Sequence, residues 1–502
     1  MKLIRLSAAL SAAMLVSSSV RAQQPAGKCE FEEGKPRQIP IAGLSLSKAS
    51  MSRDPAERAK GFKEVVKILA DVKENPEARA WYMGQALSSW MSDPGMPPNY
   101  VVTRAAAGFT DNPTQTLDLL ALVDTLFTSI EKANPACAAQ TGPWRSQRPW
   151  FNLVQKAFAL LSSGDLDSAA FYANRSRVIN RNSAYGPYVL GQVAVAKKDV
   201  AGARSNLLDA ARLAGTDTVY KEIRTQALLG VARVAAEDAE RATGDDKTAR
   251  SKQAMADLRT FLSESPFDRD APAARGMLAD LLVAAKDTIG VIGVYADVLA
   301  SPAKYGDYEK VSAGVTFTRI NRTPEATRMF ELAVEQNPNQ RDALNNLAAT
   351  YFGLNQFPKV LPVAEKLVKI DPNNPDNWLW YAYAYQGIGK AVTGKDPASV
   401  KTRKAYTDSV IKYNEKSEKM LVKVSFTNFN RGAERTELVG QLENRGTAEK
   451  SFVIAFEFLD GQGNVVTTGE AKVDGVKAKG TKEWRVAVPK GNISAFRYKP
   501  IE

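Results

Sequence analysis

The sequence predicts a mainly α-helical chain: an α-solenoid, which is a superhelix of stacked helical hairpins, followed by a small antiparallel β-sandwich. Windows of 34 residues repeat in phase through the middle of the chain. Inside each window, apolar residues recur at intervals of three and four, as they do on one face of a helix. After about residue 420, apolar residues instead alternate with polar ones, which is typical of strands.

Residues 1–22 are predicted to be a secretory signal peptide. Lys2 and Arg5 give a positive start, residues 6–20 are apolar or small, and residues 20–22 (VRA) have a small-x-small pattern that favours cleavage. The apolar run is shorter than the ~20 residues that span a bilayer. We therefore expect an exported protein, periplasmic or otherwise extracytoplasmic, and not an integral membrane protein.

The chain has two cysteines, Cys29 and Cys137. In an oxidising compartment they can form a disulfide that ties the N-terminus to the folded body. Two unpaired structural thiols are the alternative that the sequence leaves open.

Residues 23–149 are predicted to form an N-terminal helical region with a degenerate repeat. Segments 76–90 and 113–133 are amphipathic, and an Asn-Pro pair ends the second. Their connection, 93–112, is longer than the roughly 2–8 residues that usually join packed helices, which indicates a long loop that is either functional or disordered. Residues 138–149 resemble a linker into the regular array.

The regular array is predicted over 150–420, with about seven hairpins. Windows 307–340 and 341–374 align without a gap, and 150–183 and 184–217 share their register. Small residues stand eighth in each window, and small or β-branched residues twentieth, where paired helices approach closely: Ala157, Gly191, Gly314 and Ala348, then Ala169, Ala203, Ala326 and Val360. A single hairpin cannot bury its apolar stripe, so neighbours stack and leave a concave surface.

The repeat resembles the tetratricopeptide repeat (TPR) family. The residues that follow the family pattern are Leu344, Leu347, Ala348, Tyr351, Leu367 and Pro372, and then Trp378, Tyr381, Ala382 and Tyr385. The resemblance implies a groove lined chiefly by the first helix of each hairpin, in which the family holds peptides or proteins. Projected onto this chain, it selects nine partner-binding candidates: Tyr188, Gln192, Tyr308, Val315, Arg319, Asn345, Phe352, Leu379 and Tyr383.

Residues 421–502 are predicted to form the β-sandwich. Alternating stretches such as 422–426, 452–458 and 484–488 are separated by turns rich in Gly and Asn. Parts of this segment, 440–444 and 456–465, resemble the FxLYD-type extracytoplasmic domains. That resemblance implies the sandwich fold and an envelope setting, and it implies no activity.

The chain contains no histidine. This excludes Ser-His-Asp and Cys-His nucleophiles and every metal site that needs histidine. The glycine and lysine spacing over 389–395 does not fit a phosphate-binding loop, because Asp396 stands where a magnesium-binding Ser or Thr is needed. We therefore expect no catalytic, cofactor-binding or metal-binding residues, no cofactor and no enzyme activity.

Together these features predict an exported, non-enzymatic scaffold that mediates protein-protein interaction in the bacterial cell envelope through its concave groove. The expected partner is a protein or peptide, and not nucleic acid. Two alternatives stay open. In one, the β-sandwich, with the basic stretch 401–419, binds an envelope glycan or another anionic polymer. In the other, the chain is an enzyme that works with carboxylates alone.

Overall fold

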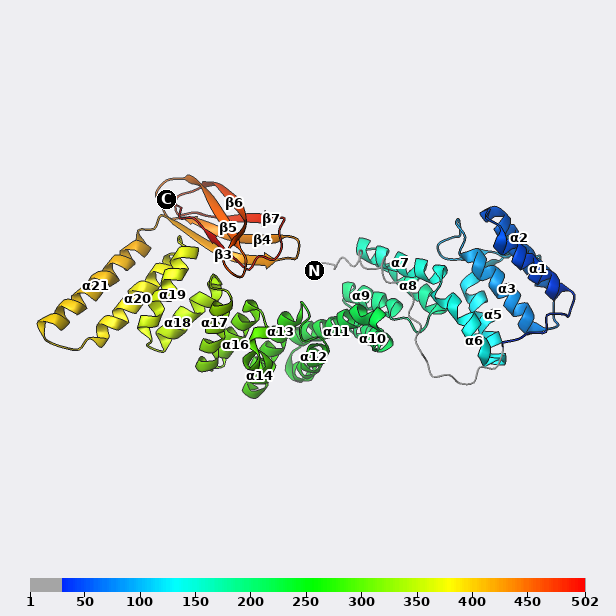
Figure 1. Cartoon of the computed structure of the whole chain (residues 1–502), viewed down its shortest axis with the longest axis horizontal. Helices are drawn as coiled ribbons and strands as arrows, with labels where there is room; N and C mark the ends of the chain where they lie inside the picture. Colours follow the sequence, from blue (N-terminus) through cyan, green and yellow to red (C-terminus); the bar gives the residue numbers. More distant parts are fainter. Residues whose placement is uncertain (1–28, 502) are drawn as a thin grey trace. The chain divides into compact units, whose positions relative to one another are not determined.

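The computed structural model describes residues 29–501, so the predicted signal peptide over 1–22 lies outside the described residues. The chain divides into two compact units, of which the first ends at Ala274 and the second begins at Arg275. Figure 1 follows the chain through both units.

The first unit opens with helices and one short hairpin: α1 (Gln38–Met51), α2 (Pro55–Leu69), α3 (Pro76–Met91), β1 (Val101–Thr103), α4 (Arg104–Ala107), β2 (Thr116–Asp118) and α5 (Leu119–Ala133). Strands β1 and β2 are antiparallel, with Val101 opposite Asp118. The long loop predicted over 93–112 therefore contains a strand and a turn of helix. Arg175 holds this segment in place, because its guanidinium donates to the Asp118 carboxylate at 2.8 Å and to the Asn99 carbonyl at 2.6 Å.

Residues 138–149, predicted as a linker, instead fold into short helical turns whose buried side chains, Thr141 and Trp144 among them, anchor the segment to the first unit. The elements here are η1 (Pro135–Cys137), α6 (Ala138–Thr141) and η2 (Gly142–Ser146). The Trp144 side chain is 3% exposed, and its ring centroid lies 5.8 Å from that of Phe127. Cys137 is fully buried and forms a disulfide with Cys29. The burial of Trp144 and the disulfide of Cys137 fix this segment in place. Its polar composition is typical of a linker, which is why the sequence did not indicate these contacts.

Three helical hairpins complete the first unit. They are α7 (Arg148–Ser163) with α8 (Leu166–Ile179), α9 (Tyr185–Ala196) with α10 (Val200–Ala214), and, after η3 (Thr218–Tyr220), α11 (Lys221–Arg241) with α12 (Gly244–Glu264). The repeat register has a direct steric cause. A Cβ at Gly191 would lie 2.6 Å from the Leu207 side chain, so glycine lets α9 and α10 meet. At the twentieth position, Ala169 and Ala203 are fully buried.

In the second unit the hairpins continue. Helix α13 (Ala271–Ala284) spans the boundary, and the elements after it are α14 (Thr288–Val294), α15 (Ala296–Ala300), η4 (Pro302–Lys304), α16 (Asp307–Arg319), α17 (Thr323–Gln336), α18 (Arg341–Gly353), α19 (Phe357–Ile370), α20 (Pro375–Ala391) and α21 (Pro397–Glu418). A Cβ at Gly314 would lie 2.5 Å from the Phe330 ring, which repeats the contact seen at Gly191. The predicted α-solenoid is confirmed.

The chain ends in the predicted antiparallel β-sandwich. Its strands are β3 (Val422–Arg431), β4 (Thr436–Asn444), β5 (Lys450–Leu459), β6 (Val465–Val476), β7 (Thr481–Val488) and β8 (Ala495–Tyr498). One sheet has the order β3-β4-β7 and the other β6-β5-β8. The inward-facing side chains of both sheets form one core, which includes Val424, Leu442, Ile454 and Phe458.

The sandwich packs against the turns that end α17 and α19, as Figure 1 shows for the orange and red strands. The Asn337 amide donates to the Asp307 carboxylate at 2.8 Å and to the Ser494 carbonyl at 3.1 Å. The Asn373 amide donates to the Ile501 carbonyl at 2.9 Å, and the Ile501 N–H donates back at 2.8 Å. Asn337, the C-cap of α17, and Asn373, in the turn after α19, thus both bind the sandwich.

Candidate functional site

Three first helices of the first unit, α7, α9 and α11, line a cavity of about 360 Å³, here named the groove cavity. Its walls are largely apolar, with Phe158 and Leu161 from α7, Tyr188 from α9, and Leu229 and Val234 from α11. Tyr188 is 3% exposed, and burial raises the pKa of its hydroxyl to about 12, with Glu222 adding to the effect. The phenol is therefore neutral at physiological pH and forms part of the apolar wall.

Two carboxamides face the groove cavity, those of Gln192 on α9 and Gln226 on α11. Neither side chain has a hydrogen-bond partner within residues 29–501. Gln226 is only 8% exposed. Because both amides line the cavity and are unpartnered within the described residues, they can form hydrogen bonds with a ligand that enters it.

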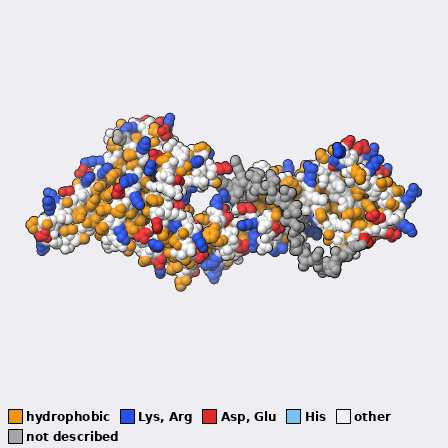
Figure 2. Space-filling model, viewed as in Figure 1, with side chains coloured by type: hydrophobic (Ala, Val, Ile, Leu, Met, Phe, Trp, Pro, Cys, Tyr) orange, Lys and Arg blue, Asp and Glu red, His pale blue; other side chains and the backbone are white. Residues whose placement is uncertain are grey.

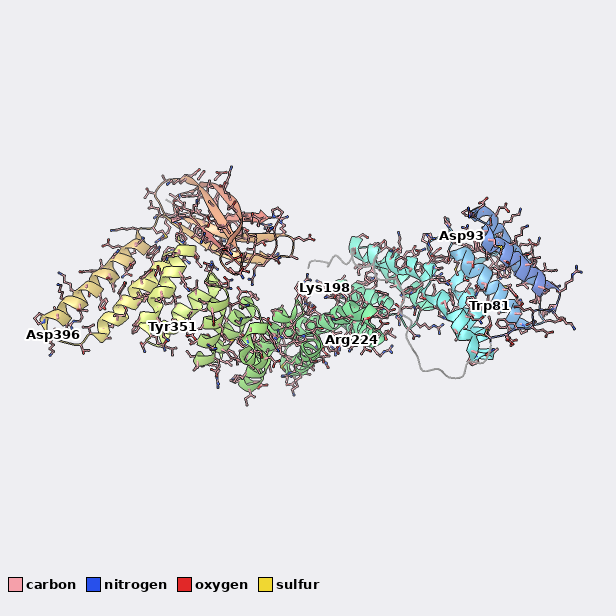
Figure 3. The ribbon with its side chains drawn as sticks, in the orientation of Figure 1. Trp81, Asp93, Lys198, Arg224, Tyr351 and Asp396 are labelled. Carbon is pink, nitrogen blue, oxygen red and sulfur yellow. A yellow bond between two sulfur atoms is a disulfide. The ribbon has the colours of Figure 1, made fainter. Side chains whose placement is uncertain are left out.

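The rim of the groove cavity is charged. Lys198 and Arg241 lie there with Asp199 and Glu237. Figure 3 labels Lys198, which lies in the turn between α9 and α10. Lys198 adopts a left-handed backbone conformation with φ of 61°, and it has no ion pair among the described residues. The rim thus offers charges of both signs around an apolar interior.

In the second unit, the first helices α18 and α20 present an aromatic patch made of Phe352, Trp380 and Tyr383. The ring centroid of Phe352 lies 6.3 Å from that of Trp380 and 5.7 Å from that of Tyr383. The indole N–H of Trp380 donates to the Asn345 side-chain oxygen at 3.1 Å, which fixes the indole. Phe352 is 37% exposed and Tyr383 39% exposed, so the patch faces solvent.

The nine candidates are therefore distributed over several places. Tyr188 and Gln192 line the groove cavity, Phe352 and Tyr383 belong to the aromatic patch, and Asn345 holds the indole of that patch. The other four lie elsewhere: Val315 is exposed by itself, Leu379 is half-buried, Arg319 pairs with Asp280, and Tyr308 lies beside the Arg431 guanidinium of the sandwich.

Sequence reasoning missed Gln226 and Trp380. Trp380 precedes Tyr383 by three residues, so a helical projection through Tyr383 already places both on one face. Gln226 lies on α11, in a hairpin that is longer than the others. The 34-residue register therefore does not extend to this hairpin and does not select Gln226.

The basic stretch 401–419 lies on α21, beside a ladder of stacked rings shared with α20. The Tyr381 and Tyr413 rings stack at 4.5 Å, and the Lys416 ammonium lies 3.7 Å from the Trp378 ring centroid. Figure 2 shows hydrophobic side chains gathered over α20 and α21. Arg403 donates to the Val392 carbonyl at 2.9 Å and so closes the loop between the two helices. Several of these cations therefore take part in intramolecular contacts.

Within the described residues, no cluster of three or more His, Cys, Asp or Glu side chains is arranged to hold a metal ion. Across the same part of the chain, no helix has the length and apolar character needed to cross a membrane.

No protein-family model matches the chain, and no curated protein matches it. The similar solved structures include TPR proteins. YrrB, described as a TPR protein with an unusual peptide-binding site, is 17% identical, with a TM-score of 0.27 over 44% of this chain and 96% of YrrB. TTC0263 from Thermus thermophilus is 14% identical, with a TM-score of 0.25 over 40% of this chain and 98% of its own. Yeast Tom70 is 12% identical, with a TM-score of 0.28 over 76% of this chain and 70% of its own.

These likenesses are confined to the helical-repeat fold, at low identity and low TM-score. The FxLYD-type resemblance of residues 421–502 stays a prediction.

Proposed function

We propose that the protein is a non-enzymatic scaffold that holds a segment of a partner protein against the first helices of its hairpins. The groove cavity carries this proposal, because Gln192 and Gln226 place two carboxamides without a partner beside an apolar interior. A carboxamide both donates and accepts hydrogen bonds, as a peptide backbone does. An extended segment that inserts one apolar side chain would therefore satisfy both amides and occupy part of the cavity.

The rim defines the chemistry of that segment further. Lys198 and Arg241 are available beside Asp199 and Glu237, which favours a segment whose apolar side chain is flanked by charged residues of both signs. Burial of the apolar side chain in the cavity provides binding affinity. The rim charges select among partner segments and orient the bound segment.

The aromatic patch of the second unit supports the same function. Exposed aromatic side chains are enriched among the residues that dominate binding energy at protein interfaces. Phe352 and Tyr383 lose little conformational freedom on binding, because Trp380 already packs beside them and is itself held by Asn345.

We further propose that the protein acts outside the cytoplasm, in a bacterial cell envelope. The Cys29–Cys137 disulfide supports this location, since disulfides persist mainly in oxidising compartments. The pattern of residues 1–22 adds independent sequence support. Fractionation of cells, with thiol alkylation before and after reduction, tests the location and the bond together.

Site-specific photo-crosslinking in living cells tests the groove. A photoreactive residue at rim position 237 or 241, which leaves both carboxamides in place, is expected to crosslink to one or a few defined proteins. The same residue in place of Phe171, which is exposed on the second helix α8, is the matched control and should not capture them. Equal capture from position 171, or no protein captured from 237 and 241, would remove the groove cavity from the proposal.

The glycan-binding and carboxylate-only alternatives stay predictions, and within residues 29–501 no specific contact favours either.

A further inference from the structure

A second cavity of the first unit lies between the segment after α3 and one face of α7. It measures about 340 Å³ and is named here the loop cavity; Met91, Asp93, Met96, Tyr100, Arg148 and Lys156 are among its lining residues. Figure 3 labels Asp93, which lies in the segment that follows α3. No residue of the groove cavity contributes to it.

Helix α7 contributes a polar stripe to the loop cavity. Arg148, Asn152 and Lys156 follow one another at intervals of four, so they share one face of the helix. Both cations are exposed, and neither forms an ion pair within the described part of the chain. Two positive charges thus line the cavity from positions about two helical turns apart on α7.

Tyr100 supplies a buried hydroxyl. The residue is 2% exposed, and its oxygen accepts a hydrogen bond from the Asn152 amide at 3.3 Å. Within residues 29–501, the phenolic proton has no acceptor. Burial raises the pKa of this phenol, so it keeps the proton that it can donate. The backbone of Tyr100 is left-handed, with φ of 56°, a conformation that a bulky residue rarely adopts.

The single acidic side chain among the lining residues, Asp93, forms an ion pair with Arg58 through one oxygen, and its other oxygen is buried without a hydrogen-bond partner in the described residues. Arg58 donates to one oxygen of the Asp93 carboxylate from Nε at 3.0 Å and from Nη2 at 2.6 Å. The opposite wall is apolar, formed by Met91 and Met96 with the prolines of the same segment. The loop cavity therefore combines an excess of positive charge with a thioether and proline wall.

The wall is also fixed in position. Arg175 on α8 binds both Asn99 and Asp118, at the two sides of the short β1–β2 pair. The Thr103 hydroxyl accepts from the Ala106 N–H at 3.2 Å and caps α4. Arg175 thus ties the segment after α3 to the repeat array, and the Thr103 cap stabilises the segment internally.

We propose that the loop cavity binds a small organic anion, whose carboxylate lies between Arg148 and Lys156 and accepts the Tyr100 proton, and whose apolar body packs against Met91 and Met96. This site is independent of the groove proposed above, and the failure of either leaves the other in place.

Methionine-methyl NMR on the full chain, which has ten methionines, tests the site directly. Titration with hexanoate is expected to shift the Met96 and Met91 methyl signals to saturation, while hexanol at equal concentration leaves them unchanged. Equal shifts with hexanol would overturn the anion requirement. Shifts with inorganic phosphate equal to those with hexanoate would overturn the role of the apolar wall. No shift with any probe would overturn the site.

A short peptide that ends in leucine distinguishes the two sources of such a carboxylate. Tighter binding than hexanoate, lost on C-terminal amidation, assigns the site to a chain end; weaker binding assigns it to a free acid. Both outcomes support an organic carboxylate as the ligand.

The variant pair is R148Q with K156Q. Because hydrogen bonds to charged groups are the strong ones, the double change is expected to weaken hexanoate binding about tenfold or more. Y100F is expected to weaken it less while leaving the charges in place. K132Q removes an exposed cation of the same unit that is not among the lining residues, and should leave binding unchanged. Undiminished binding in R148Q/K156Q, with circular dichroism showing an intact fold, would overturn the assignment.

Discussion

The hydroxyl of Tyr498, in the last strand, donates a hydrogen bond of 2.6 Å to the carboxylate of Asp371, at the end of α19. Both side chains are buried, at 3% and 1% exposed. The same hydroxyl accepts from the Asn373 N–H at 3.0 Å. One phenol therefore joins the β-sandwich to the repeat array in both directions, as donor and as acceptor.

Replacement of Tyr498 by Phe should destabilise the second unit. It leaves Asp371 without its shortest donor and the Asn373 N–H without its acceptor, and unsatisfied buried groups cost about 1–3 kcal/mol each. Denaturant unfolding of the second unit measures the loss. Y406F, which removes a hydroxyl without a hydrogen bond among the described residues, is the control. Equal stability of the two variants would contradict the assigned role.

The free energy of unfolding should depend on pH through the ionisation of Asp371. Burial raises the pKa of its carboxyl, although Arg341 and the Tyr498 hydroxyl act in the opposite direction. An unfolded aspartate titrates near ~3.9, so the folded state holds its proton to higher pH. The stability from this group is fully present below about pH 4 and is lost as pH rises through the folded pKa.

The variant D371N isolates that contribution, because asparagine still accepts from Tyr498 but does not ionise. The difference in unfolding free energy, variant minus parent, is expected to increase as pH rises from about 4. D376N, at an exposed carboxylate three residues after Asn373, provides the comparison. A difference that stays constant or decreases with pH would show that the pKa is not raised.

The double variant Q192L/Q226L separates binding from folding at the groove cavity. Both amides lack partners among the described residues, so apolar replacements of similar size should leave the unfolding free energy unchanged or higher. Capture of the crosslinked partner should be lost. Q155L changes an exposed residue of α7 outside the lining and should affect neither quantity. Full capture by Q192L/Q226L would refute the role of the amides.

The aromatic patch gives a further prediction. F352A and Y383A should preserve helicity, since both side chains are partly exposed, and should each weaken partner capture by more than about 1 kcal/mol. Quantitative pull-down of the crosslink-identified partner measures the effect. F171A, on a second helix, supplies a matched loss of an exposed ring. If F171A and F352A weakened partner capture equally, the aromatic patch would have no special role in binding.

Loss of the Cys29–Cys137 bond should destabilise the first unit. The bond closes a loop with a sequence separation of 108, for which the chain-entropy model gives close to 5 kcal/mol as an upper figure. Thermal unfolding with reductant should show a lower midpoint for the first unit alone. C29A/C137A should reproduce that midpoint and not respond to reductant. An unchanged midpoint would show that the disulfide does not stabilise the first unit.

The sequence predicts the hairpins well because their spacing has a local steric cause. Gly191 and Gly314 meet large side chains of the paired helix, and a Cβ at either position would force those side chains to move. These contacts lie within one window, so the 34-residue register contains the information. Strand alternation in the sandwich is local in the same way, since Ile454, Phe456 and Phe458 all point into one core.

The sites are harder to predict because they join residues that are distant in sequence. The bond from Arg175 to Asn99 and the cavity that Tyr100 shares with Lys156 depend on the path of a segment without periodicity. The groove candidates came from a projection of helix positions. That projection finds Tyr188 and Gln192, and it cannot show that Arg319 already has a partner in Asp280.

The contacts of Asn337 and Asn373 with the sandwich have a practical consequence for domain mapping. Cutting the chain at residue 421 would remove Arg431, which bonds to Asp307 at 3.2 Å, together with Tyr498. Two carboxylates that are now covered would face water beside the apolar edges of three hairpins. A shortened chain that lacks an activity would then report damage to the array, so single-residue variants, and not truncations, are the appropriate tools for assigning roles to residues 421–502.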